Sequence, residues 1–296
     1  MLTAQSTTPS VSILADQLPR DKLRWLGFLE HPFLSSADPR FLFLSSQHLS
    51  VLDRLEDHIT HREGLAVVEG ALGTGKTSVA RRLLDRFRDR AESCVRFIHT
   101  ADYTTSLVAL QDISRHFAVR RRRANVDQVR ELEITLADLD ARGQDPVVII
   151  DDAQRMATQS LDAMQSLLNF DKKAKLLQII LFAQPEFHDK IGRVPSVFER
   201  VSSWQILSNL PADDALAMIN YRCQTAGRDE PLLNDDSFMK IYHFTHGVPR
   251  QIVSICNEVL YLLARDAEQA ASAATVDEAI QRYRQREGAG RLRKPS

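Results

Sequence analysis

The sequence has few cysteines and no long apolar run, and these two shortages exclude several classes of protein. Its three cysteines, Cys94, Cys223 and Cys256, form neither a C-x-x-C pair nor a metal-binding spacing. Scattered thiols of this kind fit a reducing compartment, where each acts as a small buried apolar side chain. No apolar stretch approaches the roughly 18 residues that a membrane-spanning helix needs, so we expect no membrane partner.

The chain also has almost no net charge and no export signal at its start. Its formal charge is −1 over 296 residues, so a nucleic acid or membrane partner would have to be bound by a local patch. Residues 1–12 are rich in Ser and Thr and lack the basic region and apolar core of a signal peptide. We expect a cytoplasmic protein in which residues 1–20 form a flexible tail.

A complete phosphate-binding motif occupies residues 70–77. The letters GALGTGKT match G-x-x-x-x-G-K-[ST], with a strand-type apolar run at 65–69 before them and helical spacing at 78–84 after them. A strand that turns into a helix through glycines directs several backbone N–H groups and a helix N-terminus toward one anion. The motif therefore predicts a site for ATP.

The residue types of this motif assign each position a role. The glycines allow backbone angles that a Cβ would forbid, Lys76 reaches the β- and γ-phosphates, and the Thr77 hydroxyl binds Mg²⁺. The predicted nucleotide-binding residues of the motif are Gly70, Gly73, Thr74, Gly75, Lys76, Thr77 and Ser78.

Strand-like and helical patterns alternate up to residue 210. Such alternation indicates crossover connections and a parallel sheet. The runs at 147–150 and 177–182 are apolar on both faces, as a sheet covered on both sides requires. The expected strands are 65–69, 95–99, 147–150, 177–182 and 204–207, and the expected helices are 77–90, 105–118, 127–142 and 159–170.

After Pro211 only helical periodicity remains. The expected helices are 212–226, 235–245, 249–266 and 275–286. We therefore predict an α/β domain with a five-stranded parallel sheet over 21–210, a small all-α lid domain over 211–286, and a basic C-terminal tail over 287–296.

An apolar strand that ends in two aspartates supplies the carboxylates that the phosphate loop needs. We expect Asp151 to act on Mg²⁺, directly or through water. Asp152 would face the γ-phosphate and orient or deprotonate the attacking water. Taken alone, two aspartates after a strand also fit a simple turn, but their distance downstream of the phosphate loop favours a hydrolytic site.

Three further polar residues have positions that suit nucleotide chemistry. Gln184 follows the next strand, where it would contact the γ-phosphate or hold the water, or else cap the following helix. Arg200 precedes the fifth strand and would reach a neighbouring subunit's nucleotide, with Arg193 as the second candidate. Arg250 opens a lid helix after Pro249 and would report the nucleotide state to the lid. Each arginine also fits an ordinary surface position.

Together these motifs resemble the AAA+ ATPases, and more narrowly the branch of the ExeA/GspA secretion ATPases and the TnsC/TniB-type transposition regulators. The resemblance spans about residues 25–285. It rests on the phosphate loop and on the segments HPF at 31–33, DPRF at 38–41, LS at 44–45, DDAQ at 151–154, QPEF at 184–187 and GVPR at 247–250.

The resemblance implies an assembly and further roles. Pro32 and Phe33 would line the adenine site, Arg200 would be an arginine finger acting on a neighbour, and Arg250 would be a second sensor. The active form would be a ring or helical filament with ATP at the subunit interfaces. Two positions depart from the family. Asp152 stands where Glu is usual, which predicts slow hydrolysis, and Ala183 replaces a usual Gly before Gln184.

A cluster of arginines follows the expected helix 105–118. Four consecutive arginines cannot share one helix face, so they form a charge-dense loop or helix end suited to nucleic acid phosphates, or else a solvated or subunit-contacting loop. In the TnsC-like proteins the corresponding segment follows duplex DNA, so we expect backbone contact without base reading. The predicted DNA-contacting residues are Arg115, Arg120, Arg121, Arg122 and Arg123.

These features leave three candidate functions. The first is an ATP-dependent oligomer that binds duplex DNA and selects target DNA for a transposase, favoured because the chain shows no membrane span or periplasmic module. The second is a cytoplasmic ATPase that remodels a secretion or pilus assembly. The third is a slow nucleotide-gated switch. The basic segment 282–294 would dock a transposase or another partner, or else be a solubilising end.

Overall fold

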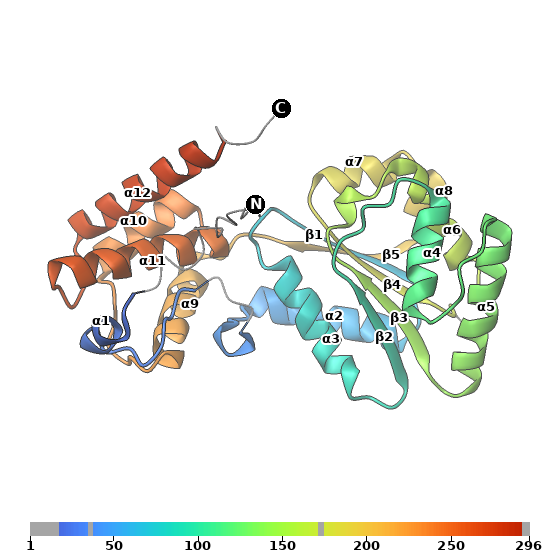
Figure 1. Cartoon of the computed structure of the whole chain (residues 1–296), viewed down its shortest axis with the longest axis horizontal. Coiled ribbons are helices and arrows are strands. Elements are labelled where there is room, and N and C mark those ends of the chain that lie inside the picture. Colours follow the sequence, from blue (N-terminus) through green and yellow to red (C-terminus); the bar gives the residue numbers. More distant parts are fainter. Residues whose placement is uncertain (1–17, 35–37, 171–174, 292–296) are drawn as a thin grey trace, which may run out of the picture. The chain divides into compact units, whose positions relative to one another are not determined.

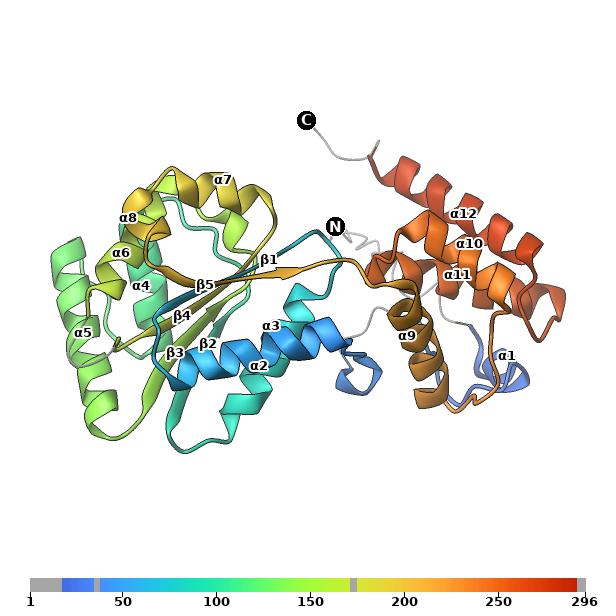
Figure 2. The same ribbon diagram turned by 180° about the vertical axis from the view of Figure 1, so that it is seen from behind.

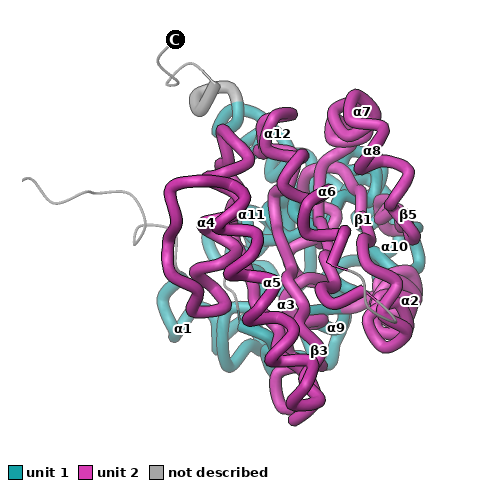
Figure 3. The backbone as a smooth tube through the Cα atoms, turned by 90° about the vertical axis from the view of Figure 1, so that its right-hand side faces the viewer, with its two compact units in different colours: residues 1–43, 211–296 teal, residues 44–210 magenta. Residues whose placement is uncertain are grey.

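The computed structural model describes residues 18–34, 38–170 and 175–291, and its backbone divides into two compact units (Figure 3). One unit, the sheet unit, comprises Leu44–Leu210. The other, the helical unit, joins the described residues up to Phe43 to those from Pro211 onward. The sequence had placed residues 21–43 with the sheet, so the structure moves this segment to the helical unit.

The sheet unit contains five parallel strands in the order β2-β3-β4-β1-β5. This confirms the predicted fold class and sheet. The strands are β1 (Leu65–Gly70), β2 (Ser93–Ile98), β3 (Asp145–Ile150), β4 (Gln178–Ala183) and β5 (Val201–Leu207). Every pair is parallel because each connection crosses back over the sheet through helices, as the alternating pattern predicts.

Helices cover both faces of this sheet (Figures 1 and 2). The helices are α2 (Ser46–Thr60), α3 (Lys76–Arg88), α4 (Ser106–His116), α5 (Asn125–Ala141), α6 (Asp162–Leu168), α7 (Glu186–Gly192) and α8 (Pro195–Phe198), with short 3-10 turns η2 (Ala153–Arg155) and η3 (Thr158–Ser160). Alternate residues of β1 enter separate cores. Ala66 and Val68 pack with α2 and α3, whereas Leu65 and Val67 pack with α4–α8.

The helical unit confirms the predicted change to helical periodicity after Pro211. Its elements are α1 (Arg20–Trp25), the 3-10 turn η1 (Pro39–Phe41), α9 (Ala212–Thr225), α10 (Asp235–Thr245), α11 (Pro249–Asp266) and α12 (Ala273–Arg291). The sequence predicted that the helical pattern ends near residue 286, but α12 continues to Arg291. Residues 1–17 and 292–296 of the predicted tails lie outside the described residues.

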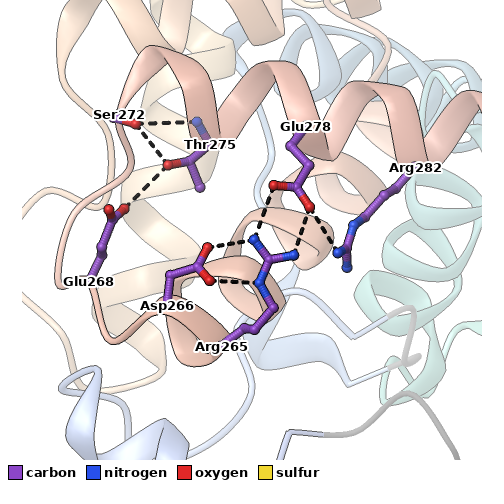
Figure 4. A network of polar contacts seen from close by, with 7 residues as sticks. All are labelled: Arg265, Asp266, Glu268, Ser272, Thr275, Glu278 and Arg282. Atoms are coloured by element: carbon purple, nitrogen blue, oxygen red, sulfur yellow. Dashed lines mark hydrogen bonds and ion pairs between the residues drawn. The ribbon is translucent and has the colours of Figure 1, made fainter.

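Ion pairs connect the end of α11 to α12 on the surface of the helical unit (Figure 4). Arg265 bonds to Asp266 and Glu278, and Glu278 also bonds to Arg282. These side chains are all substantially exposed. Exposed ion pairs are screened by water and salt, so the network contributes little to the stability of the unit.

Two arginines from the C-terminal half bond to backbone carbonyl groups of the N-terminal segment of the helical unit. Arg222, on α9, donates to the carbonyl oxygens of Pro32 (2.8 Å), Leu34 (3.0 Å) and Phe41 (2.9 Å). The buried Arg228 donates to the carbonyl oxygen of Leu26 at 2.6 Å. Segments far apart in sequence are thereby joined, which is why local patterns assigned this stretch to the wrong unit.

Candidate nucleotide site

The phosphate loop lies between β1 and α3, as the motif predicts. Gly75 has φ of 101°, a left-handed conformation that strongly favours glycine. Gly70 is required for a different reason, since a Cβ there would lie only 2.8 Å from the carbonyl oxygen of Leu207. The two glycines allow the chain to turn tightly and to run close to the end of β5.

The lysine and the first threonine of the motif make contacts within the loop. Lys76 is buried, and its Nζ donates to the carbonyl oxygens of Gly70 at 2.7 Å and Ala71 at 3.0 Å. The hydroxyl of the buried Thr74 also donates to the Ala71 oxygen, at 2.9 Å. The loop therefore holds the Lys76 ammonium where phosphates would meet it, while Ser78, the third residue of α3, is half-buried.

The phosphate loop meets the end of β3 through one short hydrogen bond. The Thr77 hydroxyl donates to Oδ2 of Asp151 at 2.6 Å, although 74 residues separate them in sequence. Burial raises the pKa of the Asp151 carboxyl, while the bond from Thr77 opposes that rise. A hydroxyl and a carboxylate are oxygen ligands of the kind Mg²⁺ prefers, and a cation beside them would offset the cost of burying a carboxylate. The pair therefore fits the predicted Mg²⁺ site.

The predicted catalytic carboxylate has an unusual backbone conformation. Asp152 lies directly after Asp151 with φ of 52° and ψ of 38°, in the left-handed region. Non-glycine residues in this region are uncommon and are enriched in Asn and Asp. The turn exposes the Asp152 side chain partly while Asp151 stays buried. The two carboxylates thus have different environments, which suits one to a metal and the other to a water molecule.

Gln154 joins the two predicted catalytic side chains, and sequence reasoning gave it no role. Its Nε2 donates to Oδ1 of Asp152 at 2.9 Å, and its Oε1 accepts from the backbone N–H of Gln184 at 3.2 Å. The side chain is 9% exposed. Its position two residues after Asp152 in the DDAQ segment was the available signal. The structure thus places the loops after β3 and β4 in direct contact.

The two candidate arginine fingers flank α8, with Arg193 before it and Arg200 after it. Arg193 is exposed directly after α7. Arg200 lies just before β5, where its guanidinium bonds to the carbonyl oxygen of Ser196 and to Oδ1 of Asn169. Neither residue has a hydrogen bond or ion pair with the phosphate loop among the described residues. A role on a neighbouring subunit stays a prediction.

The other nucleotide-site candidates, Pro32, Phe33 and Arg250, belong to the helical unit. Pro32 and Phe33 are buried, and the contacts of Arg222 flank them. Next to them, His31 accepts a bond from the N–H of Phe33 at 3.2 Å, and burial lowers its pKa to about 4. Arg250 is exposed as the second residue of α11, after the left-handed turn at His246 and Gly247.

The predicted DNA-contacting arginines lie at the end of α4 and in the loop before α5, as expected. Gln128, fully buried, holds the loop from inside. Its Oε1 accepts from the N–H of Arg122 at 2.7 Å, and its Nε2 donates to the Arg120 oxygen at 3.3 Å. A surface pocket of about 410 Å³ is lined by Leu107, Gln111, Arg121, Arg122 and Arg123. Arg115 lies on α4, paired with Asp112 at 2.5 Å.

The parallel sheet, the phosphate loop after β1 and the aspartates after β3 define a P-loop domain of the AAA class. Residues 59–191 match the family described as AAA domain. This match covers slightly less than half of the chain, and the sheet unit has the α/β AAA fold.

The chain is similar in sequence to a named secretion protein. Over 242 residues the chain is 27% identical to general secretion pathway protein A of Aeromonas hydrophila; the match covers 80% of this chain and 44% of that protein. The chain thus spans less than half of that relative's length. This similarity confirms a distant relationship to the secretion proteins of the predicted branch.

Solved structures with little sequence identity share the fold. The Aeropyrum pernix ORC1 protein in complex with DNA has a TM-score of 0.64 at 14% identity, covering 86% of this chain and 71% of that one. The Thermotoga maritima RuvB Holliday junction branch migration motor has a TM-score of 0.54 at 13% identity, covering 84% and 72%. At such low identities these structures show the fold alone. No helix among the described residues is both long enough and apolar enough to cross a membrane.

Proposed function

We propose that the chain binds ATP with Mg²⁺ and hydrolyses it to ADP and phosphate. The observation that carries this proposal is the 2.6 Å hydrogen bond from Thr77 to Asp151. That bond brings the metal-binding hydroxyl of a phosphate loop and the carboxylate of the neighbouring strand to one point. Proteins that only bind an anion need the loop, whereas phosphoryl transfer needs both parts together.

The side chains around this point have separate roles. Lys76 neutralises the β- and γ-phosphates, while Thr77 and Asp151 hold Mg²⁺, which when bound offsets the charge of the phosphate oxygens. Asp152 orients the attacking water and accepts its proton. Gln154 fixes Asp152 relative to Gln184, which follows the neighbouring strand.

In an assembly, further arginines complete the site. Arg200 stabilises the γ-phosphate of a neighbouring subunit, and Arg250 couples the nucleotide state to the helical unit. We infer a ring or helical filament, with the base of ATP against Pro32 and Phe33. The short Asp152 side chain makes hydrolysis slow, because its oxygens reach one methylene less far than those of Glu.

For the biological process we propose ATP-driven remodelling of a secretion or pilus assembly. The supporting observation is the similarity to general secretion pathway protein A, which extends over 80% of this chain. The match does not include 56% of that relative. The proposed partner is therefore taken from the name of the relative, and not from a partner-binding region that both chains share.

A second candidate is ATP-dependent binding of duplex DNA, with a transposase or target-selection protein as partner. The arginine loop favours it. Gln128 fixes the backbone at Arg120 and Arg122, so the exposed side chains of Arg121 and Arg123 are displayed from an ordered loop. Within the described residues neither of these two has a carboxylate partner. Ordered, unpaired guanidinium groups suit phosphate contacts that carry no base information.

Phosphate release tests the enzymatic proposal. The wild-type chain should release phosphate from ATP only with Mg²⁺. Asp152→Asn should bind ATP normally but turn over at least about tenfold more slowly, whereas Asp57→Asn, an exposed position on α2, should match wild type. If Asp152→Asn hydrolyses ATP like wild type, the catalytic carboxylate lies elsewhere, and Glu69 would be tested next.

Duplex binding separates the two candidate processes. With a slowly hydrolysed ATP analogue, wild type should bind DNA only if the second candidate holds. In that case Arg121→Glu with Arg123→Glu should weaken binding equally for all sequences and reduce the salt dependence. Charge reversal at Arg88 and Arg142, two exposed arginines of the same unit, is the control. No duplex binding at low salt leaves the secretion-type process.

A further inference from the structure

A buried histidine outside the sequence motif contacts the phosphate loop. His48 lies in the first turn of α2 and is 3% exposed. Its Nε2 is 3.0 Å from the carbonyl oxygen of Thr74, and its Nδ1 is 2.7 Å from the hydroxyl of Ser45. The ring therefore connects the start of α2 to the centre of the loop, across 26 residues of sequence.

The partners of this ring decide where its proton lies. The Thr74 carbonyl only accepts hydrogen bonds, so Nε2 must carry the hydrogen. Nδ1 faces the backbone N–H of Ser45 at 3.3 Å, which only donates, and the Ser45 hydroxyl. Nδ1 therefore accepts, and a ring with hydrogen on Nε2 satisfies these contacts with Ser45 and Thr74. The capping box of α2, formed by Ser45 and His48, holds the ring in this orientation.

The contact fixes one peptide plane of the loop. None of the peptide bonds is cis within the described residues, and in a trans peptide the C=O and the following N–H point in opposite directions. Anchoring the Thr74 oxygen on His48 therefore turns the Gly75 N–H away from the ring. The ring also lies close to Gly75 itself, since a Cβ there would be 2.8 Å from Nε2.

We propose that His48 is a positioning residue of the phosphate site: its Nε2–H holds the Thr74–Gly75 peptide so that the Gly75 N–H faces the phosphates. The proposal rests on the proposed ATP site, because N–H groups of this loop are the expected phosphate donors. A donor that is already oriented needs no rearrangement when the ligand binds, so its loss weakens phosphate binding. His48 acts through the peptide and does not touch the ligand.

The neighbouring Gln47 provides a matched control. It lies in the same turn of α2, but its side chain bonds to the carbonyl oxygen of Ile206 at 3.1 Å and to the N–H of Ser208 at 3.3 Å. A substitution at Gln47 therefore disturbs the same helix start and the end of β5, and leaves the Thr74 contact in place. Any effect specific to the phosphate loop should appear at His48 and not at Gln47.

Two substitutions of His48 separate its two hydrogen bonds. In His48→Gln the side-chain amide nitrogen is as many bonds from Cα as Nε2, so it can still donate to Thr74. In His48→Asn the amide reaches only the Nδ1 position, near Ser45. We would measure binding of Mg²⁺–ATP and Mg²⁺–pyrophosphate by calorimetry, and the Gly75 amide shift on adding pyrophosphate by NMR. Pyrophosphate tests the loop without the base.

The expected results follow from the Thr74 contact. His48→Asn should bind both ligands about tenfold more weakly, the size expected for weakening one hydrogen bond to a charged ligand, and should show a smaller Gly75 shift. His48→Gln and Gln47→Ala should remain within about twofold of wild type. If His48→Asn does not fold, Ser45→Ala is used instead. It removes the 2.7 Å hydroxyl contact to Nδ1 and leaves only the backbone N–H of Ser45 there, so it should weaken pyrophosphate binding more than Gln47→Ala does.

Two failures are distinguishable. If wild type binds neither Mg²⁺–ATP nor Mg²⁺–pyrophosphate, the proposed nucleotide function fails. If wild type binds both and His48→Asn binds them equally well with the full Gly75 shift, or Ser45→Ala matches Gln47→Ala, the role of His48 is overturned.

Discussion

Replacing Arg222 should destabilise the helical unit far more than replacing Arg265, a surface arginine of that unit that makes more hydrogen bonds. The three carbonyl oxygens that Arg222 binds belong to Pro32, Leu34 and Phe41. Methionine has a similar volume but no donor, so all three would lose their partner. At about 1 kcal/mol per partly buried bond, Arg222→Met should lower the free energy of unfolding by about 3 kcal/mol.

Arg265 is the matched control for this prediction. It makes four hydrogen bonds, one more than Arg222, and all of them are to carboxylates on the surface of the same unit. A count of bonds would make Arg265 the more important residue. Water can replace these exposed bonds, so Arg265→Met should have a much smaller effect than Arg222→Met.

The two tryptophans of the chain allow the assay to follow one unit at a time. Trp25 belongs to the helical unit and Trp204 to the sheet unit. In a Trp204→Phe background, urea unfolding monitored by Trp25 fluorescence reports the helical unit. With a slope of about 2 kcal/mol per M urea, Arg222→Met should shift the midpoint down by about 1.5 M. An unchanged midpoint, or a larger shift for Arg265→Met, would show that the carbonyl contacts of Arg222 do not stabilise the helical unit.

Three further predictions concern turnover. Asp152→Glu should raise the rate of phosphate release above wild type, because the longer side chain brings the carboxylate closer to the water. Gln154→Leu should lower turnover while ATP affinity stays near wild type in calorimetry, since the side chain joins Asp152 to the loop of Gln184 without binding phosphate. Arg200→Ala should lower hydrolysis without loss of ATP affinity. Mixing Arg200→Ala subunits with Lys76→Ala subunits should partly restore hydrolysis. If co-assembled mixtures show no recovery, Arg200 acts in the site of its own subunit.

The features that the sequence predicted correctly are local or periodic. The phosphate loop, the strand before Asp151 and the helices after Pro211 each leave a pattern within a few neighbouring residues, and strand–helix alternation is enough to predict a parallel sheet. The Thr77–Asp151 contact was predictable. The phosphate loop follows one strand and Asp151 follows another, and parallel strands end at the same edge of a sheet.

The features that were missed depend on single polar side chains that reach across the chain. Arg222 bonds to residues more than 180 positions away. Gln128 bonds to backbone groups that have no sequence signature, and the bond of Gln154 to the backbone of Gln184 has none either, although its place in the DDAQ segment was a signal. Residues 21–43 were assigned to the sheet because their aromatic pattern does not show which unit they pack with. The carbonyl contacts of Arg222 and Arg228 join this segment to the helical unit.

Calorimetric titration with ATP, with and without Mg²⁺, decides whether the loop at residues 70–77 binds a nucleotide. Wild type should show saturable binding that tightens with Mg²⁺. Lys76→Ala should lose that binding, because the ammonium next to the Gly70 and Ala71 oxygens is the charge that the phosphates would meet. Wild type that binds no ATP, or Lys76→Ala that binds it equally well, would contradict the assignment of this loop as a nucleotide site.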